Sequence, residues 1–311
     1  MSRIDFDAIP ASTYKLLLII VTAIWGSTFI MMKDVVGSIE PAWLIGIRFF
    51  SAGVILLIAL RKHVARFISR KVVSMGVLLG IFDFTAFLFQ TIGLQHTTPG
   101  INAFLTATYC VIVPFIWWIV ARRRPTLINV TTALFALVGI WLVSVSSSDS
   151  GLTLGIGEGL TLIGAVMFAV HIVFVSKFSQ LGDVLTLTVL QFLTEGACGL
   201  LVGAAFETAP TLAAFTPSVV AQLVFLVLFA SIFCFGTQNI ALAHVPPAQA
   251  SLFLSLESVF GVIFSVALYG EVLTARLIIG FVVIFIAIAA NETLPQMGDR
   301  FLKKKQRSST K

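Results

Sequence analysis

Ten apolar stretches, each long enough to cross a bilayer, follow one another along this chain of 311 residues with only short breaks. A helix needs roughly 20 apolar residues to span the hydrocarbon core. Backbone polar groups must be paired internally inside lipid, which leaves helices or a closed barrel. Barrel strands would show about ten residues of strict alternation, whereas these runs are continuous and rich in Leu, Ile, Val, Phe and Ala. The sequence therefore predicts an all-α integral membrane protein with ten transmembrane helices.

Breaks that carry proline, glycine or charge divide the apolar stretches, as at Glu40–Pro41 and Gly270–Glu271. Proline is tolerated in the first turn of a helix, because its missing N–H would have no partner there anyway. The ten predicted spans are 13–32, 41–60, 71–93, 99–121, 127–144, 155–176, 184–206, 218–242, 247–269 and 275–291.

The composition agrees with a chain embedded in a membrane. Apolar residues make up 58% of the sequence and charged residues 11%, whereas a soluble domain carries about a quarter charged residues. The net charge of +6 comes mostly from loops and the tail, so it gives no reason to expect nucleic acid as a partner. The three cysteines lie in predicted spans without metal-ligand spacing, so we expect no disulfide framework, metal or other cofactor.

Basic residues gather in the segments of one membrane face. Positive charge accumulates on the cytoplasmic side, and an even number of spans places both termini there. In this orientation only Lys33 and Arg276, of the 20 Lys and Arg, lie outside, and Arg48 lies within a span. We expect a multi-pass protein of the plasma (inner) membrane with both termini cytoplasmic, a retained first helix rather than a signal peptide, and a basic cytoplasmic tail over 292–311.

The chain repeats a short pattern at a constant spacing. The residues Gln90, Ile92, Leu94, His96 and Pro99 recur in register as Gln238, Ile240, Leu242, His244 and Pro247. The two halves would be 12–144 and 155–291, joined by a connector rich in Ser and Gly. Five spans is an odd number, so the second half is inverted relative to the first. Inverted repeats are the architecture of alternating-access transporters.

Several motifs resemble the drug/metabolite transporter superfamily, EamA type. They are W-G-S-T-F at 25–29, R-F at 48–49, S-L-E-S-V-F at 255–260 and G-E at 270–271. The resemblance covers nearly the whole chain. It implies two inverted five-helix repeats around a central cavity and transport of small organic solutes, often the export of amino acids or related metabolites. In this sequence the first-half counterpart of Glu257 is Tyr109, so the two halves differ chemically.

Five ionisable residues lie at membrane depth: Arg48, Asp83, His171, Glu195 and Glu257. Such residues are costly in lipid and usually face a cavity or a partner. Each could instead belong to a structural pair or reach water from a span end. For His171, a hydrogen-bonded packing role is the simpler interpretation.

Polar residues also form stripes on four predicted helices, because positions three, four or seven apart share a helix face. Four stripes favour a polar-lined interior over hydrogen bonding between helices alone. Trp25, with Phe29, could wall a site for an apolar or aromatic group. The candidate substrate-binding residues are Trp25, Arg48, Gln90, Asn102, Tyr109, His171, Glu195, Gln238 and Glu257.

We expect a secondary transporter, not an enzyme, that moves a small organic solute outward by alternating access. Arg48 would hold a carboxylate and Glu257 a cationic group, which favours amino acids. A carrier of sugar phosphates or nucleotide sugars should show several deep cations. Protons or another coupling ion are left open as partners.

Two other classes remain as alternatives. An intramembrane enzyme would need a nucleophile beside a base or a metal cluster, and the chain contains no H-E-x-x-H, P-loop or G-x-S-x-G motif. A receptor or scaffold that transports nothing would not need two inverted halves with polar interiors.

Overall fold

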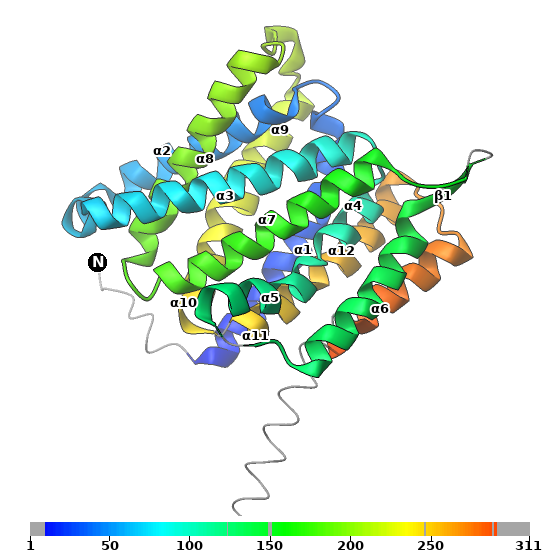
Figure 1. Ribbon diagram of the computed structural model, residues 1–311. Helices are drawn as coiled ribbons and strands as arrows, with labels where there is room; N and C mark the ends of the chain where they lie inside the picture. Colours follow the sequence, from blue (N-terminus) through cyan, green and yellow to red (C-terminus); the bar gives the residue numbers. More distant parts are fainter. Residues whose placement is uncertain (1–9, 123, 149–150, 246, 288, 291–311) are drawn as a thin grey trace, which may run out of the picture.

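The computed structural model describes residues 10–122, 124–148, 151–245, 247–287 and 289–290 (Figure 1). This part of the chain is helical except for one short hairpin. Seven of its helices are long and apolar enough to cross a membrane, and three shorter apolar helices cover Leu127–Leu142, Leu256–Tyr269 and Ala275–Ala287. The prediction of a helical membrane protein is therefore confirmed.

The helices follow the predicted order. The first half contains α1 (Ala11–Val35), α2 (Pro41–Phe67), α3 (Arg70–Gln95), α4 (Pro99–Thr106), α5 (Tyr109–Ala121) and α6 (Leu127–Ser144). The second half contains α7 (Ile156–Phe178), α8 (Val184–Phe206), the 3₁₀ turn η2 (Leu212–Ala214), α9 (Pro217–Phe225), the π-helix η3 (Leu226–Phe235), α10 (Gly236–His244), α11 (Pro247–Leu254), α12 (Leu256–Phe264) and the π-helix η4 (Ser265–Tyr269). A last helix covers Ala275–Ala287.

Three of the predicted continuous helices are interrupted in the structure. The span predicted at 99–121 is divided at Ala107 and Thr108, where the Thr108 hydroxyl and amide both bond to the carbonyl of Leu105. The span at 247–269 is divided at Ser255. The span at 218–242 contains the π-helical stretch η3. Local hydrogen bonds of this kind leave no signature in hydropathy, so the apolar pattern alone could not predict them.

The connector between the halves also differs from the expectation of a plain linker. It forms two strands, β1 (Val145–Ser148) and β2 (Gly151–Leu154), which pair antiparallel with Val145 opposite Leu154. The hairpin projects beyond the helices at one end of the molecule (Figure 1).

Helices from the two halves pack closely against each other. α2 lies against α8, and α3 packs against both α7 and α8. Where α2 and α8 cross, a Cβ added at Gly199 would lie 2.5 Å from the backbone nitrogen of Gly46. Small residues allow helix backbones to approach in this way, which provides van der Waals contact where lipid offers no hydrophobic drive for association.

Large apolar side chains cover the outside of the molecule. On α6 the exposed large apolar residues are Leu127, Val130, Leu134, Phe135, Leu137, Val138 and Trp141. Contiguous apolar surface of this kind marks contact with a membrane or a partner. α6 lies beside the C-terminal helix, at Gly139 and Ile284, and the two form one edge of the molecule (Figure 1).

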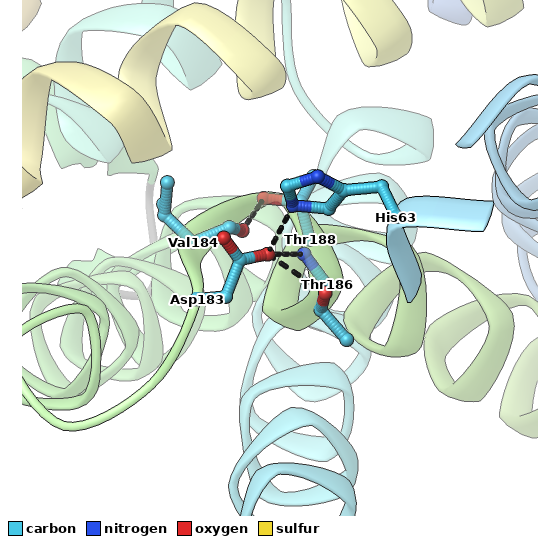
Figure 2. Close-up of polar contacts among 5 residues, drawn as sticks. All are labelled: His63, Asp183, Val184, Thr186 and Thr188. Carbon is cyan, nitrogen blue, oxygen red and sulfur yellow. Dashed lines mark hydrogen bonds and ion pairs between the residues drawn. The ribbon is translucent and has the colours of Figure 1, made fainter. Parts of the chain in front are cut away.

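A polar contact links the end of α2 to the start of α8 (Figure 2). The Asp183 carboxylate caps α8 by accepting from the amide and the hydroxyl of Thr186 at 2.8 and 2.7 Å. The same carboxylate oxygen lies 2.9 Å from His63 Nε2. The end of α2 and the start of α8 therefore lie at the same membrane face.

Candidate functional site

A central cavity of about 40 Å³ lies between helices of both halves. Its polar lining consists of Thr28, Arg48, Gln90, Thr106, Tyr109, His171, Gln238 and Glu257, and its apolar lining of Trp25, Phe29, Met32, Phe87, Phe168, Ile172 and Phe235. One water needs roughly 10–15 Å³ by this kind of measure, so the cavity has room for a few waters. A larger solute can enter only if the surrounding helices or side chains move apart.

Arg48 presents a buried guanidinium group to this cavity. Its Nε donates to the Ser231 hydroxyl at 2.8 Å, and its carbon Cζ lies 4.6 Å from the ring centre of Phe49 and 5.1 Å from that of Phe87. Its Nη1 contacts the sulfur of Met32 at 3.6 Å. Within the described residues, no carboxylate lies within ion-pair distance of Arg48. Its terminal nitrogens therefore retain capacity for an anionic ligand.

The π-helix η3 positions two of the groups around Arg48. Its Ala230 carbonyl accepts a hydrogen bond from Trp25 Nε1 at 2.9 Å, and its next residue is Ser231. The Phe235 ring packs on Trp25 with centroids 4.8 Å apart. π-Helical turns are rare and are found frequently at functional sites. Here the wider turn joins Trp25 of α1 and Arg48 of α2 to the second half.

Tyr109 and Glu257 occupy matching places in the two halves. Tyr109 is the first residue of α5, directly after the interruption at Thr108, and Glu257 follows the interruption at Ser255. Both side chains line the same small cavity. The positions that the sequence repeat pairs thus meet at one cavity, with a carboxyl group from one half and a phenol from the other.

Gln90 and Asn102 have different roles in the structure. Gln90 lines the cavity and donates to the Thr106 hydroxyl at 2.9 Å. Asn102 lies behind it and donates to the Gln90 carbonyl at 3.1 Å and to the Thr161 hydroxyl at 2.7 Å. Asn102 therefore joins α3, α4 and α7, and it is not among the residues that line the cavity.

A second polar cluster lies beside the cavity, on α3, α7 and α8. Asp83 Oδ2 accepts from Gln191 Nε2 at 2.7 Å, and Asp83 Oδ1 lies 3.5 Å from His171 Nδ1. Gln191 Oε1 in turn accepts from Asn239 Nδ2 at 3.2 Å. Glu195, on the same face of α8 as Gln191, is fully buried, and neither of its carboxyl oxygens has a hydrogen-bond partner in the described structure.

The candidate residues thus divide between two places. Trp25, Arg48, Gln90, Tyr109, His171, Gln238 and Glu257 line the cavity. Asn102 and Glu195 are buried outside its lining. The sequence did not single out Met32, Phe87, Phe168 or Phe235, because nothing along the chain distinguishes these side chains among 28 Phe and six Met.

Hydrogen bonds from two charged residues hold the segments at one end of the cavity region together, and the α3–α4 loop is called fastened for this reason. The Lys33 ammonium group donates to the carbonyls of Leu94, Gln95 and Thr97 at 2.6, 3.1 and 2.9 Å. The Glu271 carboxylate accepts from the Thr98 hydroxyl at 2.5 Å and from a backbone amide at the start of α4. These contacts tie the loop between α3 and α4 to α1 and to the segment after η4.

The opposite end is more open. A hollow of about 480 Å³ is bordered by the ends of α5, α7 and α10, including Trp117, Lys177 and His244. His244 stacks on Tyr14, near the start of α1, with centroids 4.9 Å apart. Lys33 lies near the end of α1, so the fastened loop and the hollow belong to opposite membrane faces.

Membrane-length helices with an apolar exterior and a buried polar cavity define an integral, multi-pass membrane protein. The sequence model of the EamA-like transporter family matches residues 13–145 and 155–291. The chain belongs to this family, within the drug/metabolite transporter superfamily, and is a membrane transporter. The resemblance of the motifs at 25–29 and 255–260 is thereby confirmed.

Relatives agree with this assignment, and a solved structure shares the fold. An uncharacterized transporter of Archaeoglobus fulgidus is 31% identical over 271 residues, which cover 87% of this chain and 83% of that protein. The uncharacterized transporter YyaM of Bacillus subtilis is 27% identical over 85% of this chain and 88% of its own. One crystal structure, 17% identical, superposes with a TM-score of 0.68 over 92% of this chain and 98% of its own, and shares the fold.

Proposed function

We propose that this protein is a secondary transporter that exports small organic metabolites, with amino acids as the main substrate class. The observation that carries the proposal is the pairing of Arg48 and Glu257 around one cavity with an aromatic wall. An amino acid carries a carboxylate and an ammonium group close together. Arg48 would hold the carboxylate by a charge-assisted hydrogen bond, and Glu257 would hold the ammonium group.

The aromatic lining favours solutes with an apolar body. Trp25, Phe87, Phe168 and Phe235 surround the charged groups. Aromatic rings offer a large apolar surface of fixed shape, and Trp25 is held in place by its hydrogen bond to Ala230. Larger apolar and aromatic amino acids fit this lining better than small polar ones.

Phosphorylated sugars fit the cavity poorly. Arg48 is the one Lys or Arg among the described residues that line it. A phosphate group bears up to two negative charges, and a buried charge without a partner is strongly unfavourable. The single guanidinium group, with Glu257 opposite, supports selection against sugar phosphates and nucleotide sugars.

We further propose alternating access between two inverted five-helix repeats, 12–144 and 155–291, with ten spans in all. The seven long and three shorter apolar helices support this count. The separate family matches to 13–145 and 155–291 support the division. In this interpretation the fastened α3–α4 loop is the closed exit and the hollow beside His244 is the entry. The positive-inside pattern supports a plasma-membrane protein with the entry and both termini cytoplasmic.

The test is solute counterflow with the full-length protein in proteoliposomes. Vesicles loaded with unlabelled L-phenylalanine, L-leucine, L-lysine or glucose-6-phosphate are diluted into the labelled form of the same solute. We expect accumulation of the apolar amino acids and none of the sugar phosphate. Protein-free vesicles and the Arg48→Gln variant serve as controls. Selective counterflow of glucose-6-phosphate would contradict the proposed substrate class.

A further inference from the structure

We propose that Asp83 and Glu195, beside His171, form a proton-binding site whose occupancy is linked to the ligand bound at Arg48. The inference rests on the proposed transport function and concerns groups outside the solute contacts. It identifies the coupling ion as the proton and assigns it to a place separate from Glu257.

Burial and hydrogen bonding set these three residues apart. Their side chains are fully buried, yet Asp83 Oδ1, both His171 ring nitrogens and both Glu195 oxygens have no hydrogen-bond partner in the described structure. Buried polar atoms are almost always paired. A site that gains and loses protons needs such unpaired atoms, and here two buried carboxyl groups provide them.

The charges of the cluster balance with one exchangeable proton. Arg48 carries a permanent positive charge, and Glu195 and Asp83 are the carboxyl groups that act on it electrostatically. Two ionised carboxylates would leave a net negative charge in a medium of low dielectric constant. One proton on either carboxyl group makes the set neutral. The proton comes from water, and no other bond is made or broken.

His171 connects this site to the cavity. Its ring lines the cavity, and its Nδ1 lies 3.5 Å from Asp83 Oδ1. The ring therefore lies between the cavity and Asp83. The Glu195 backbone nitrogen lies 3.0 Å from a Cβ built at Gly80, one turn before Asp83 on α3, so Asp83 and Glu195 share the contact between α3 and α8.

The linkage to the solute follows from Arg48. An anionic group bound at Arg48 adds a negative charge beside the cluster and weakens the attraction of Arg48 for the two carboxylates. Uptake of a second proton offsets that charge. By reciprocity, protonation strengthens solute binding by the same factor. One linked proton changes the apparent affinity by at most about tenfold per pH unit. Solute and proton then leave together, so net export requires an outward solute gradient that exceeds the opposing proton gradient.

Other titratable groups face the cluster from several helices. Arg48 of α2 acts on both carboxyl groups, and Tyr109 and Glu257 line the same cavity as His171. Cys198 of α8 acts on Glu195, and Cys234 of η3 acts on Arg48. The contacts from α8 and α10 at Gln191 and Asn239 carry no titratable group. Asp83 and Glu195 are the carboxyl groups of the cluster itself and are therefore the groups to vary.

The first test needs no solute. Infrared difference spectra between acidic and alkaline buffer are recorded on the full-length protein in phosphatidylcholine vesicles. We expect a buried-carboxyl band that is lost or shifted in Glu195→Gln and Asp83→Asn. The control Asp34→Asn removes an exposed carboxylate at the end of α1 and should retain the band. Should Asp83→Asn fail to insert, Glu195→Gln gives the test by itself.

The second test measures the linkage with L-leucine and L-phenylalanine as probes. We expect the apparent affinity of wild type to rise several-fold per unit fall in pH, and Glu195→Gln to flatten this dependence. A carboxyl band unchanged by both acid substitutions overturns the proposal, as does Na⁺ dependence without pH dependence. Absence of amino-acid transport in wild type contradicts the proposed function instead and leaves the solute-free spectrum as an independent result.

Discussion

The Nε of Arg48 donates to the Ser231 hydroxyl at 2.8 Å, and this bond joins α2 of the first half to the π-helix η3 of the second. The two residues lie 183 positions apart in the chain. Because the bond orients the guanidinium group, the direction in which its terminal nitrogens point depends on the relative position of the two halves.

Ser231→Ala should therefore weaken transport without unfolding the protein. A hydrogen bond to a charged group contributes about 1.5–3 kcal/mol, so we expect the KM for L-leucine to rise about tenfold or more. The matched control is Ser27→Ala, which removes a hydroxyl bonded only within its own helix, to the Ile24 carbonyl. Equal effects of the two substitutions would show that the Arg48 contact has no special role.

Glu257→Gln should impair transport far more than membrane insertion. The glutamine keeps the size and hydrogen-bonding capacity of the side chain and loses only the charge proposed to hold an ammonium group. Because Tyr109 and Glu257 line the same small cavity, the effects of Tyr109→Phe and Glu257→Gln on the rate should not add. Counterflow of L-leucine measures the rate, and size-exclusion profiles report on folding. A normal rate in Glu257→Gln would assign the residue a structural role.

Lys33→Met should loosen the loop between α3 and α4. The substitution removes three hydrogen bonds to the carbonyls of Leu94, Gln95 and Thr97. We expect a cavity-lining reporter, Thr28→Cys, to react several-fold faster with a thiol reagent added from that face. The reporter is read in a background without native cysteines. Asp34→Asn, next to Lys33 in the chain, is the control, and an unchanged rate in Lys33→Met would exclude the loop as a closure.

The proposed orientation predicts opposite labelling of two exposed positions. Lys62→Cys lies near the end of α2, at the face where His63 meets Asp183, and Leu212→Cys lies beyond the end of α8. In a background lacking Cys110, Cys198 and Cys234, an impermeant thiol reagent added to whole cells should label position 212 only. Labelling of position 62 from outside would reverse the proposed topology.

Gly199→Ala should destabilise the fold, because the added Cβ would lie 2.5 Å from the backbone nitrogen of Gly46 and the helices would have to separate. Overpacking of this kind costs about 1–3 kcal/mol, which predicts a fall in Tm of several degrees in detergent. Gly236→Ala is the control, since a Cβ there meets no atom within 4 Å. A Tm loss in Gly236→Ala as large as that in Gly199→Ala would mean that contact at the α2–α8 crossing is not the cause.

Sequence reasoning predicted the apolar helices well and their interiors less well. The predicted bounds 127–144 and 184–206 agree with α6 and α8. Hydropathy reports the length of the segment that lies in lipid. This length sets where a helix begins and ends. The interruptions at Thr108 and Ser255 and the π-helix η3 depend on local hydrogen bonds and on neighbours from other helices, which leave no periodic trace in the chain.

For the candidate site, too, the sequence predicted some features and could not predict others. Arg48, His171 and Glu257 could be selected from the sequence because charge at membrane depth is costly and therefore rare. Glu195 was selected by the same reasoning and Asn102 from a polar stripe on its helix, yet both lie outside the cavity lining. A stripe of polar residues identifies a helix face, but it does not say whether that face meets a cavity or another helix.

The sequence by itself determined the class of protein and the order of its apolar helices, because transfer into lipid depends on the composition of each segment. It also placed the few charges that such a segment can carry. Only the tertiary structure decided that Tyr109 and Glu257 line one cavity, that Arg48 meets Ser231, and that Glu195 remains without a hydrogen-bond partner. Those relationships join residues far apart in the chain, so they depend on how the helices pack and not on any one segment.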